Sequence, residues 1–297
     1  MRTTFNSSYM ISAADLARTS EDLAKRQAQV SSGRRISKPS DDPSASSGSV
    51  HEHAEMAALD RYAQTADTAT ARLSIVDSVL SDMLDQLTSA KTTILNARGS
   101  NVTATQRGAL ADQLSGLRDA ILADYGTSFN GNYLFSGEAA KTAPYTKNAN
   151  GTVSAYAGTA TTMAVDVDRN TAVTVSLNGD AVARGSDAVD IFAALDQAIT
   201  DIRAGNAAGM ADAGAAVERA FGRATSAQTG IGTAMNAVEI HQGRVADLRR
   251  ASEGRAAGLE QVNMAEAITK MSQADTAYRA ALGAIGNTGR KSLMDYL

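Results

Sequence analysis

The sequence predicts a mainly α-helical protein with a small antiparallel β insert, in which both chain ends build a long helical coiled-coil bundle. Three observations predict it. Apolar residues recur at intervals of three and four through residues 59–94 without a fault. The chain has only three prolines, the last at Pro144, so no later residue lacks the N–H that a helix needs. Asn-Gly dipeptides and period-two runs interrupt the helical pattern between about 130 and 186.

The composition favours helices packed side by side through small residues. The chain has 297 residues, of which 43% are hydrophobic and only 4% aromatic, with no tryptophan. This length suffices for one or two domains with their own cores. Because aromatic volume is scarce while alanine, serine and threonine are plentiful, small interdigitating side chains must fill the core.

Charge and cysteine usage exclude several classes of protein. The net charge of −4 argues against a nucleic-acid partner. Residues 1–35 carry six bases and three acids, and residues 244–297 carry eight and six, so the middle holds a net −9. Without cysteine there are no disulfides. No run approaches the roughly 18 apolar residues that span a bilayer, and the N-terminus lacks the apolar core of a signal peptide. We therefore expect no membrane insertion, and either a cytoplasmic location or export without a cleaved signal.

The first predicted helix covers residues 9–30 and has one thin apolar stripe. Its strict heptad is Tyr9, Leu16, Leu23 and Val30. Small or polar residues complete the 3/4 spacing at Ala13, Ser20 and Gln27. A helix with so narrow a stripe needs a partner surface to be stable.

The next segment, SSGRRISKPSDDP, ends one helix and begins another. Gly33 and Pro39 stop the first helix, and Asp42 before Pro43 is an N-cap carboxylate followed by proline at the first helical position. Asp41 lies near the positive end of that helix. The helix from about 43 to 97 is expected to be about 80 Å long at about 1.5 Å per residue. Its core positions are Leu59, Tyr62, Ala66, Ala69, Leu73, Val76, Leu80, Met83, Leu87, Ala90 and Ile94.

A third helix precedes the β insert. Thr103 and Gln106 form a capping box at its start, and its apolar positions are Leu110, Leu114, Leu117 and Ile121. The insert covers about 130–186, with Asn-Gly turns at 130, 150 and 178 and alternating apolar runs at 163–167 and 173–177. Because its ends enter and leave through adjacent loops, we expect the insert to be separable from the bundle.

Three helical segments follow the insert. The first runs from about Asp187 to Gly205, and the second from about 210 past 255. The last carries the period to Ile285, so both chain ends can be neighbours if the chain folds back. This predicts three parts: 1–33 with 259–297, 34–129 with 187–258, and the insert 130–186. The terminal stripes are predicted to contact other subunits through Tyr9, Leu16, Leu23, Val30, Leu259, Val262, Ile268, Met271, Tyr278, Leu282 and Ile285.

No pattern of residues predicts an enzyme. His51-Glu52-His53 with Glu55 could suggest a metal, but His53 points to another helix face than His51 and Glu55. A solvated helix start is the better interpretation, and His241 is interpreted as a surface or interface imidazole. The chain has neither a G-x-S-x-G elbow nor a phosphate-binding loop. We expect no catalytic residues, no cofactor and no metal.

Four strings of residues resemble the flagellin-like family of bacterial flagellar proteins. The segment SSGRRISKPSDDP is similar to the one that follows the first helix of flagellin-type proteins. Its Pro39–Pro43 version resembles the hook–filament junction family (hook-associated protein 3) more than filament flagellin. The string Asn130–Gly137 resembles that family's entry into its β domain, and Met264–Ile285 resembles its C-terminal helix. The ending Ser292–Leu297 is similar to its tail. The motif residues are Pro39, Asp41, Asp42, Pro43, Tyr133, Leu134, Phe135, Gly137, Leu293, Tyr296 and Leu297.

The resemblance implies an architecture and partners. The terminal helices would form an inner coiled-coil tube, surrounded by helical bundles, with a β domain outside. The subunit would be exported by the flagellar type III apparatus with an export chaperone. It would then be extracellular in the flagellum, in a ring of its own copies between hook-associated protein 1 and flagellin.

Two other functions fit parts of the pattern. A minor or short flagellin, building the filament itself, would share the terminal stripes and the bundle. A soluble coiled-coil signalling or chaperone protein would share the long helices, but neither the thin terminal stripes nor the four strings.

Overall fold

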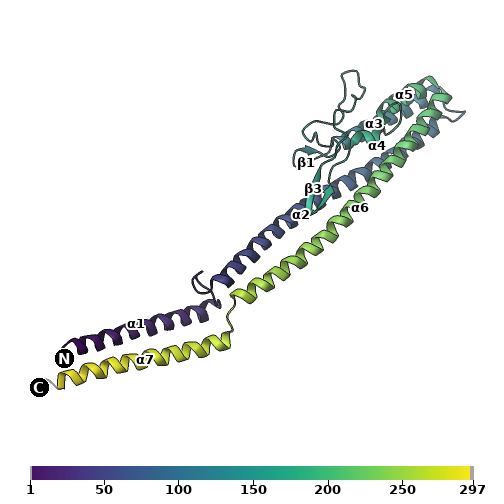
Figure 1. Cartoon of the computed structure of the whole chain (residues 1–297). Coiled ribbons are helices and arrows are strands. Elements are labelled where there is room, and N and C mark those ends of the chain that lie inside the picture. Colours follow the sequence, from purple (N-terminus) through teal and green to yellow (C-terminus); the bar gives the residue numbers. More distant parts are fainter. Residues whose placement is uncertain (1, 295–297) are drawn as a thin grey trace. The chain divides into compact units, whose positions relative to one another are not determined.

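The computed structural model describes the backbone of residues 2–294 and the side chains of residues 10–286. Three long helices precede the insert, and three follow it, as predicted (Figure 1). The helices in this part of the chain are α1 (Arg2–Ser32), α2 (Pro43–Ala97), α3 (Ala104–Tyr125), α4 (Gly179–Ala183), α5 (Ile191–Ala204), α6 (Ala207–Glu260) and α7 (Met264–Met294). The strands are β1 (Ser128–Phe129), β2 (Asn132–Tyr133), β3 (Ala164–Asp168) and β4 (Thr171–Thr174).

The chain divides into two compact units. Unit 1 contains Met1–Ala58 and Leu248–Leu297, so it holds α1, α7, their connectors and one end of both α2 and α6. Unit 2 contains Leu59–Asp247, with the rest of α2 and α6, α3, α5 and the insert.

The core of unit 2 follows the predicted apolar pattern of α2. All the predicted positions from Leu59 to Ile94 are buried except Tyr62, which is half-buried. Those from Ala66 to Ile94 pack with residues of α3, α5 and α6 into one apolar cluster. The α6 residues in it include Val217, Ala224, Ile231 and Val238.

Two helix starts show what the sequence defines locally. The capping box of α3 is confirmed: the amide of Gln106 donates to Thr103 Oγ1 at 3.3 Å, and the amide of Thr103 donates to Gln106 Oε1 at 2.8 Å. Helix α5 begins four residues after the predicted Asp187. Asp190 is its N-cap, while the Asp187 carboxylate accepts from Arg223 Nη1 at 2.8 Å.

The insert contains two hairpins, both antiparallel. In β1–β2 the Asn130-Gly131 pair forms the predicted turn, with positive φ values of 52° and 71°. Strands β3 and β4 pair Val165 with Val173, and the register shifts between Asp166 and Asp168. The third predicted Asn-Gly turn is wrong, because the Asn178 side chain accepts from two amides and caps α4.

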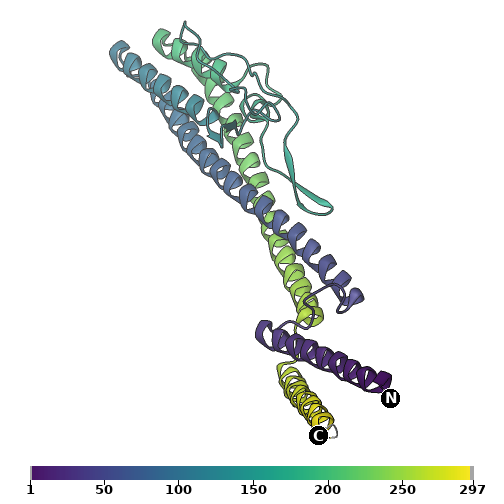
Figure 2. The same ribbon diagram turned by 90° about the vertical axis from the view of Figure 1, so that its left-hand side faces the viewer.

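The insert, which the sequence predicts to be separable, shares core contacts with the bundle. The Phe135 ring of the insert packs 5.2 Å from Tyr125 of α3, and the Tyr145 ring packs 5.3 Å from Tyr125 and 4.8 Å from Phe192 of α5. In Figures 1 and 2 the teal segment between α3 and α5 lies against the other elements of unit 2. One apolar cluster therefore includes both the insert and the helices.

The string Tyr133–Gly137 provides the core anchor of the insert. Leu134 and Phe135 are fully buried. Gly137 has φ +64°, and a Cβ there would lie 2.3 Å from the carbonyl oxygen of Thr159. Only glycine therefore allows this backbone to pass so close to its neighbour. The motif is structural, since it fixes the insert onto α3 and α5.

Candidate assembly surface and its connectors

Helices α1 and α7 pack against each other along unit 1 (Figure 1). The connector after α1 is bridged to the one before α7 through Arg34 and Gln261. Because α1 ends and α7 begins at this bridge, the two helices run antiparallel. The N-terminal and C-terminal helices are therefore neighbours, as the sequence predicts.

The seam between the two helices is narrow and has heptad spacing. On α1 the less exposed positions repeat at intervals of four and three, and so do those on α7. Ala267 and Ala274 are the buried ones, and the larger side chains stay half-buried. The seam positions are Ser12, Leu16, Thr19, Leu23, Arg26 and Val30 on α1 and Ala267, Met271, Ala274, Tyr278, Ala281 and Ile285 on α7.

The intermediate positions of the α1 stripe differ from the prediction. Ala13, Ser20 and Gln27 are exposed, and the seam passes one residue earlier in each heptad. Leu16, Leu23 and Val30 were correctly placed on one face. That face contacts α7 of the same chain.

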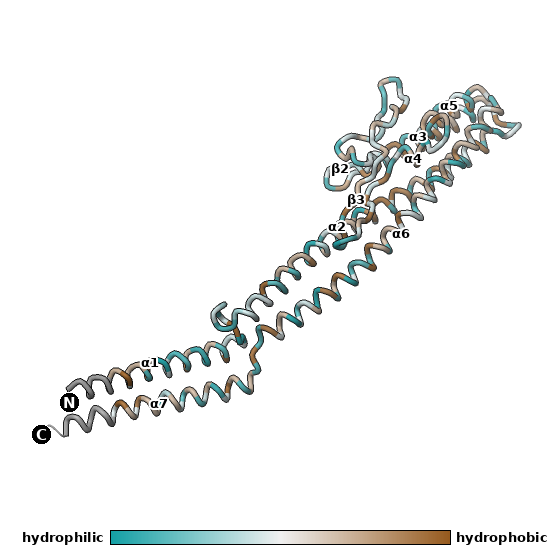
Figure 3. The backbone as a smooth tube through the Cα atoms, in the orientation of Figure 1, coloured by the Kyte–Doolittle hydropathy of each residue, from teal (hydrophilic) through white to brown (hydrophobic). Residues whose placement is uncertain are grey.

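Large apolar side chains remain outside this seam. Ile268 is 49% exposed and Leu282 is 44% exposed on α7. Met264 on α7 and Met10 and Ile11 on α1 are also exposed. Figure 3 shows such apolar stretches recurring between hydrophilic ones along α7. We refer to Met264, Ile268 and Leu282 as the outer face of α7.

Three of the predicted contact residues lie elsewhere. Leu259 is the penultimate residue of α6 and packs beside Gly48 of α2, where a Cβ would lie 3.0 Å from Leu259 Cδ1. Val262 lies in the connector, between α6 and α7. The side chain of Tyr9 on α1 lies outside the described residues, as does that of the motif residue Leu293 on α7.

The last two motif residues, Tyr296 and Leu297, also lie outside the described residues.

The start of α7 explains why the predicted C-terminal stripe, which included Leu259 and Val262, begins too early in the sequence. The Asn263 side chain accepts from the amides of Ala265 and Glu266 at 3.1 and 3.4 Å, which begins a new helix.

The two connectors hold each other through backbone hydrogen bonds. The amide of Arg35 donates to the carbonyl of Glu260 at 2.7 Å, and the amide of Val262 donates to the carbonyl of Gly33 at 3.0 Å. Gly33 has φ +69°, a conformation that glycine adopts without strain. Gln29, buried at the end of α1, donates to the carbonyl of Arg35 at 2.9 Å. This network fixes where α1 and α7 leave the long helices.

Asp41 and Asp42 stabilise the connector between α1 and α2. Asp41 accepts from Lys25 at 2.8 Å and from the amides of Ser37 and Lys38. Asp42 is the N-cap of α2, since it accepts from the amide of Ala45 at 3.0 Å. It also accepts from Arg35 Nη1 at 2.9 Å. Pro43 follows as the first helical residue, as predicted, and Pro39 is exposed in the turn.

We expect acid to loosen this connector. The hydrogen bond from Lys25 lowers the pKa of Asp41 to about 2, and that from the Ala45 amide lowers the pKa of Asp42 to about 2. Both values lie below the ordinary 3.8. The carboxylates therefore add stability above about pH 4, and this stability is lost as the pH falls toward 2.

Thermal unfolding followed by circular dichroism between about pH 6 and pH 2 tests this. Wild type should exceed the Asp41→Asn/Asp42→Asn variant in Tm above about pH 4, and the gap should close near pH 2. Asp15→Asn is the matched control, because Asp15 is an exposed carboxylate of α1 that meets Arg18 at 3.5 Å. A Tm difference between wild type and this variant that stays constant across the pH range would contradict a stabilising role of the two carboxylate charges.

Glu260, the last residue of α6, collects polar contacts from α2 and the connector. Its carboxylate accepts from Ser49 and lies 2.6 Å from His53 Nε2 and 3.6 Å from Arg34. The hydrogen bond from Ser49 lowers the pKa of Glu260. His53 thus has a carboxylate partner in unit 1, which agrees with its interpretation as part of a helix start.

The described part of the chain shows neither a metal cluster nor a membrane span. Within it, no three His, Asp or Glu side chains are grouped as metal ligands would be. None of its helices has the length and hydropathy that crossing a membrane requires. The features that stand out are the exposed apolar residues of α1 and α7 and the hydrogen-bond network of the two connectors.

Comparisons with known proteins agree with these features. Residues 4–140 match the family model of the bacterial flagellin N-terminal helical region. Flagellar hook-associated protein 3 of Escherichia coli is 30% identical over 188 residues, which cover 59% of this chain and 58% of that protein. The Salmonella typhimurium protein of the same name is 28% identical over 235 residues, which cover 74% and 73%.

Solved structures show the same fold. A protein from Vibrio parahaemolyticus, assigned as a flagellar hook-associated protein, superposes with a TM-score of 0.70 at 20% identity, covering 74% of this chain and 100% of that one. The flagellar junction protein of Legionella pneumophila gives 0.58 at 16% identity, covering 72% and 100%. The chain is therefore similar in sequence, over part of its length, to flagellin-type proteins and to hook-associated protein 3, and it shares its fold with solved flagellar hook-associated and junction proteins.

Proposed function

We propose that this chain is the structural subunit that joins the flagellar hook to the flagellin filament. It contacts hook-associated protein 1 on one side, flagellin on the other and copies of itself within a ring. It is extracellular, in the flagellum, and reaches that place through the flagellar type III apparatus, held by an export chaperone and without a cleaved signal peptide. The relatives named hook-associated protein 3 support this role.

One observation carries the proposal: the outer face of α7 is apolar and exposed, although α7 already pairs with α1. The seam fully buries only the small residues Ala267 and Ala274, and the large residues Ile268 and Leu282 lie outside it. Apolar residues on a narrow helix pair gain most free energy when other helices cover them. This supports terminal helices, at 1–33 and 259–297, that pack between subunits, whereas the predicted division of the remaining chain into 34–129 with 187–258 and 130–186 stays a prediction.

Electron microscopy of cells that lack this protein tests the junction role. We expect hooks without filaments, with flagellin lost to the medium, and restored filaments when the wild-type chain is supplied. Normal filaments in the deletion strain would overturn the proposal. Cells without hooks would instead indicate a role at an earlier assembly step.

A minor flagellin is the second candidate, because the matching family model is that of the flagellin N-terminal region. The two functions differ in self-assembly, since a contact that repeats along a helical lattice builds an open filament. A junction subunit presents different surfaces to its two neighbours.

We therefore expect the purified protein to remain monomeric or to form short oligomers, even with salt or filament seeds. Sedimentation and electron microscopy check this, with flagellin as the positive control. Long filaments of this chain alone would favour the flagellin function. A stable dimer in solution that cannot restore filaments would favour a soluble coiled-coil signalling or chaperone protein.

A further inference from the structure

One buried arginine in unit 2 has no anionic partner in the described part of the chain. Arg72 lies on α2, beside the core residue Leu73, and is only 6% exposed. Its Nε and Nη2 atoms are buried without a hydrogen-bond acceptor, and Nη1 meets Met163 Sδ at 3.7 Å. A thioether is a weak acceptor, so the guanidinium charge is uncompensated. Burial lowers the pKa of Arg72, as it does for a cation removed from water.

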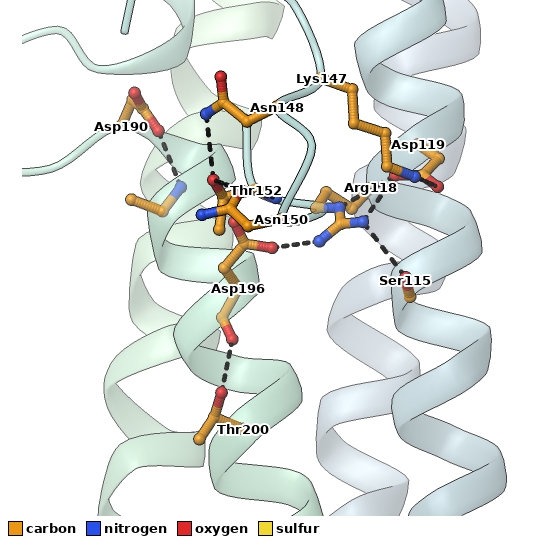
Figure 4. Close-up of polar contacts among 11 residues, drawn as sticks. Ser115, Arg118, Asp119, Lys147, Asn148, Asn150, Thr152, Asp190, Asp196 and Thr200 are labelled. Atoms are coloured by element: carbon orange, nitrogen blue, oxygen red, sulfur yellow. Dashed lines mark hydrogen bonds and ion pairs between the residues drawn. The ribbon is translucent and has the colours of Figure 1, made fainter. Parts of the chain in front are cut away.

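A second buried arginine of the same unit shows how this protein normally pairs such a charge. Arg118 of α3 is equally buried, at 7% exposed. Figure 4 shows its guanidinium between the carboxylates of Asp119, at 2.8 Å, and Asp196 of α5. Lys147 completes the cluster by binding Asp119 at 2.6 Å. Arg72 therefore stands out because it lacks what Arg118 has.

Arg72 lines a pocket of about 230 Å³ between α2 and the insert. Hydroxyl and amide groups from Thr65, Thr68, Asn130 and Asn132 share this lining, with apolar walls that include Val165. These polar groups can donate to an oxygen anion, and the lining includes no carboxylate. The Nε–H and Nη2–H groups of Arg72 have no acceptor and match the two oxygens of a carboxylate. Because both atoms are buried, the side chain must turn toward the pocket to bind one.

We propose that the Arg72 pocket binds a carboxylate, supplied by an aspartate or glutamate side chain of a second copy of this chain. The pocket is smaller than the roughly 300–1,000 Å³ of typical small-molecule sites, and its apolar wall suits the methylene groups of an acidic side chain. The middle of the chain holds a net charge of −9, so each copy offers many carboxylates. The identity of the second copy rests on the proposed function, whereas carboxylate binding itself does not.

The isolated subunit tests the binding chemistry, with acetate as the probe. We expect the Arg72 Nε–H resonance to shift saturably with sodium acetate and not with sodium chloride at equal ionic strength. In chloride, Arg72→Met should unfold at a Tm equal to or above that of wild type, because it removes an unpaired buried charge while keeping the stem's volume. Arg118→Met is the matched control and should lower the Tm, since it leaves Asp119 and Asp196 without this partner.

Two results in the isolated subunit would overturn the site. One is an Arg72 resonance that acetate leaves unmoved. The other is a loss of Tm in Arg72→Met as large as in Arg118→Met, which would make Arg72 an ordinary structural residue. A response to inorganic phosphate and not to acetate would also reject a carboxylate site in favour of a phosphate site.

Assembled flagella test the source of the carboxylate. The chain has no cysteine, so Thr68→Cys, in the pocket lining, can carry a single thiol-linked benzophenone. We expect cross-links to a peptide of a second copy that contains Asp or Glu, and fewer filaments per cell with Arg72→Met. Cross-links to other flagellar proteins alone would overturn the second-copy assignment. If wild type fails to restore filaments in the deletion strain, the proposed function fails, and the acetate result is unaffected.

Discussion

Charging the outer face of α7 should abolish filaments without unfolding the subunit. In the Ile268→Asp/Leu282→Asp variant, two exposed apolar side chains become carboxylates, which the monomer keeps in water. If these positions are covered by other subunits, each buried charge costs several kcal/mol unless it is paired. Repeated around a ring, such a cost prevents assembly. We expect a monomer Tm close to that of wild type, export into the medium, and no motility on soft agar.

Gln273→Asp gives the matched control, because Gln273 is exposed on the same helix between the two apolar positions. It adds a charge to α7 without removing an apolar side chain, and it should leave motility near that of wild type. If the Gln273→Asp control also lost motility, a charge anywhere on α7 would block assembly. A large drop of the monomer Tm in the double variant would show that the outer face stabilises the monomer.

The long helices were predictable because each signal in the sequence is local and strong. Along α2 the buried positions differ sharply in hydropathy from their neighbours, and the Asp42-Pro43 start uses a side chain and a ring that act on the adjacent turn. The same applies to the capping box at Thr103. These elements keep their predicted bounds because no distant contact competes with them.

The terminal seam was less predictable because its alternate positions have little hydropathy contrast. On α1, Ser12, Thr19 and Arg26 face α7, whereas Ala13 and Ser20 do not. Small and polar residues occur at both sets of positions, so the pattern cannot choose between them. Only the partner helix decides the register.

Two features, the break before α7 and the unpaired charge of Arg72, were not predicted for other reasons. The break before α7 had a local signal: Asn263 with Glu266 is an N-cap pattern. The apolar period that continues through Leu259 and Val262 obscured it. The unpaired charge of Arg72 had no such signal, because neighbours in sequence do not show which carboxylates a fold brings close.

Phe135→Ala should cost the subunit about 3–5 kcal/mol of unfolding free energy, the usual loss when a large aromatic ring is removed from a core. Phe135 is fully buried, and its ring centroid lies 5.2 Å from that of Tyr125. Because this ring ties the insert to α3, we expect the change to weaken unit 2 as a whole. Urea unfolding followed by circular dichroism and by tyrosine fluorescence should shift together to lower urea.

Tyr145→Phe separates ring packing from the hydroxyl group in the same cluster. The Tyr145 ring packs 4.8 Å from Phe192, but its hydroxyl is buried without a hydrogen-bond partner among the described residues. Removing this hydroxyl should leave the stability of the subunit unchanged or raise it, since an unsatisfied buried polar group costs about 1–3 kcal/mol.

Two separate urea transitions in Phe135→Ala, with the helical signal unaffected by the first, would contradict a core shared by the insert and the helices. They would restore the interpretation of residues 130–186 as an independent insert, because a unit that unfolds alone cannot hold the bundle together.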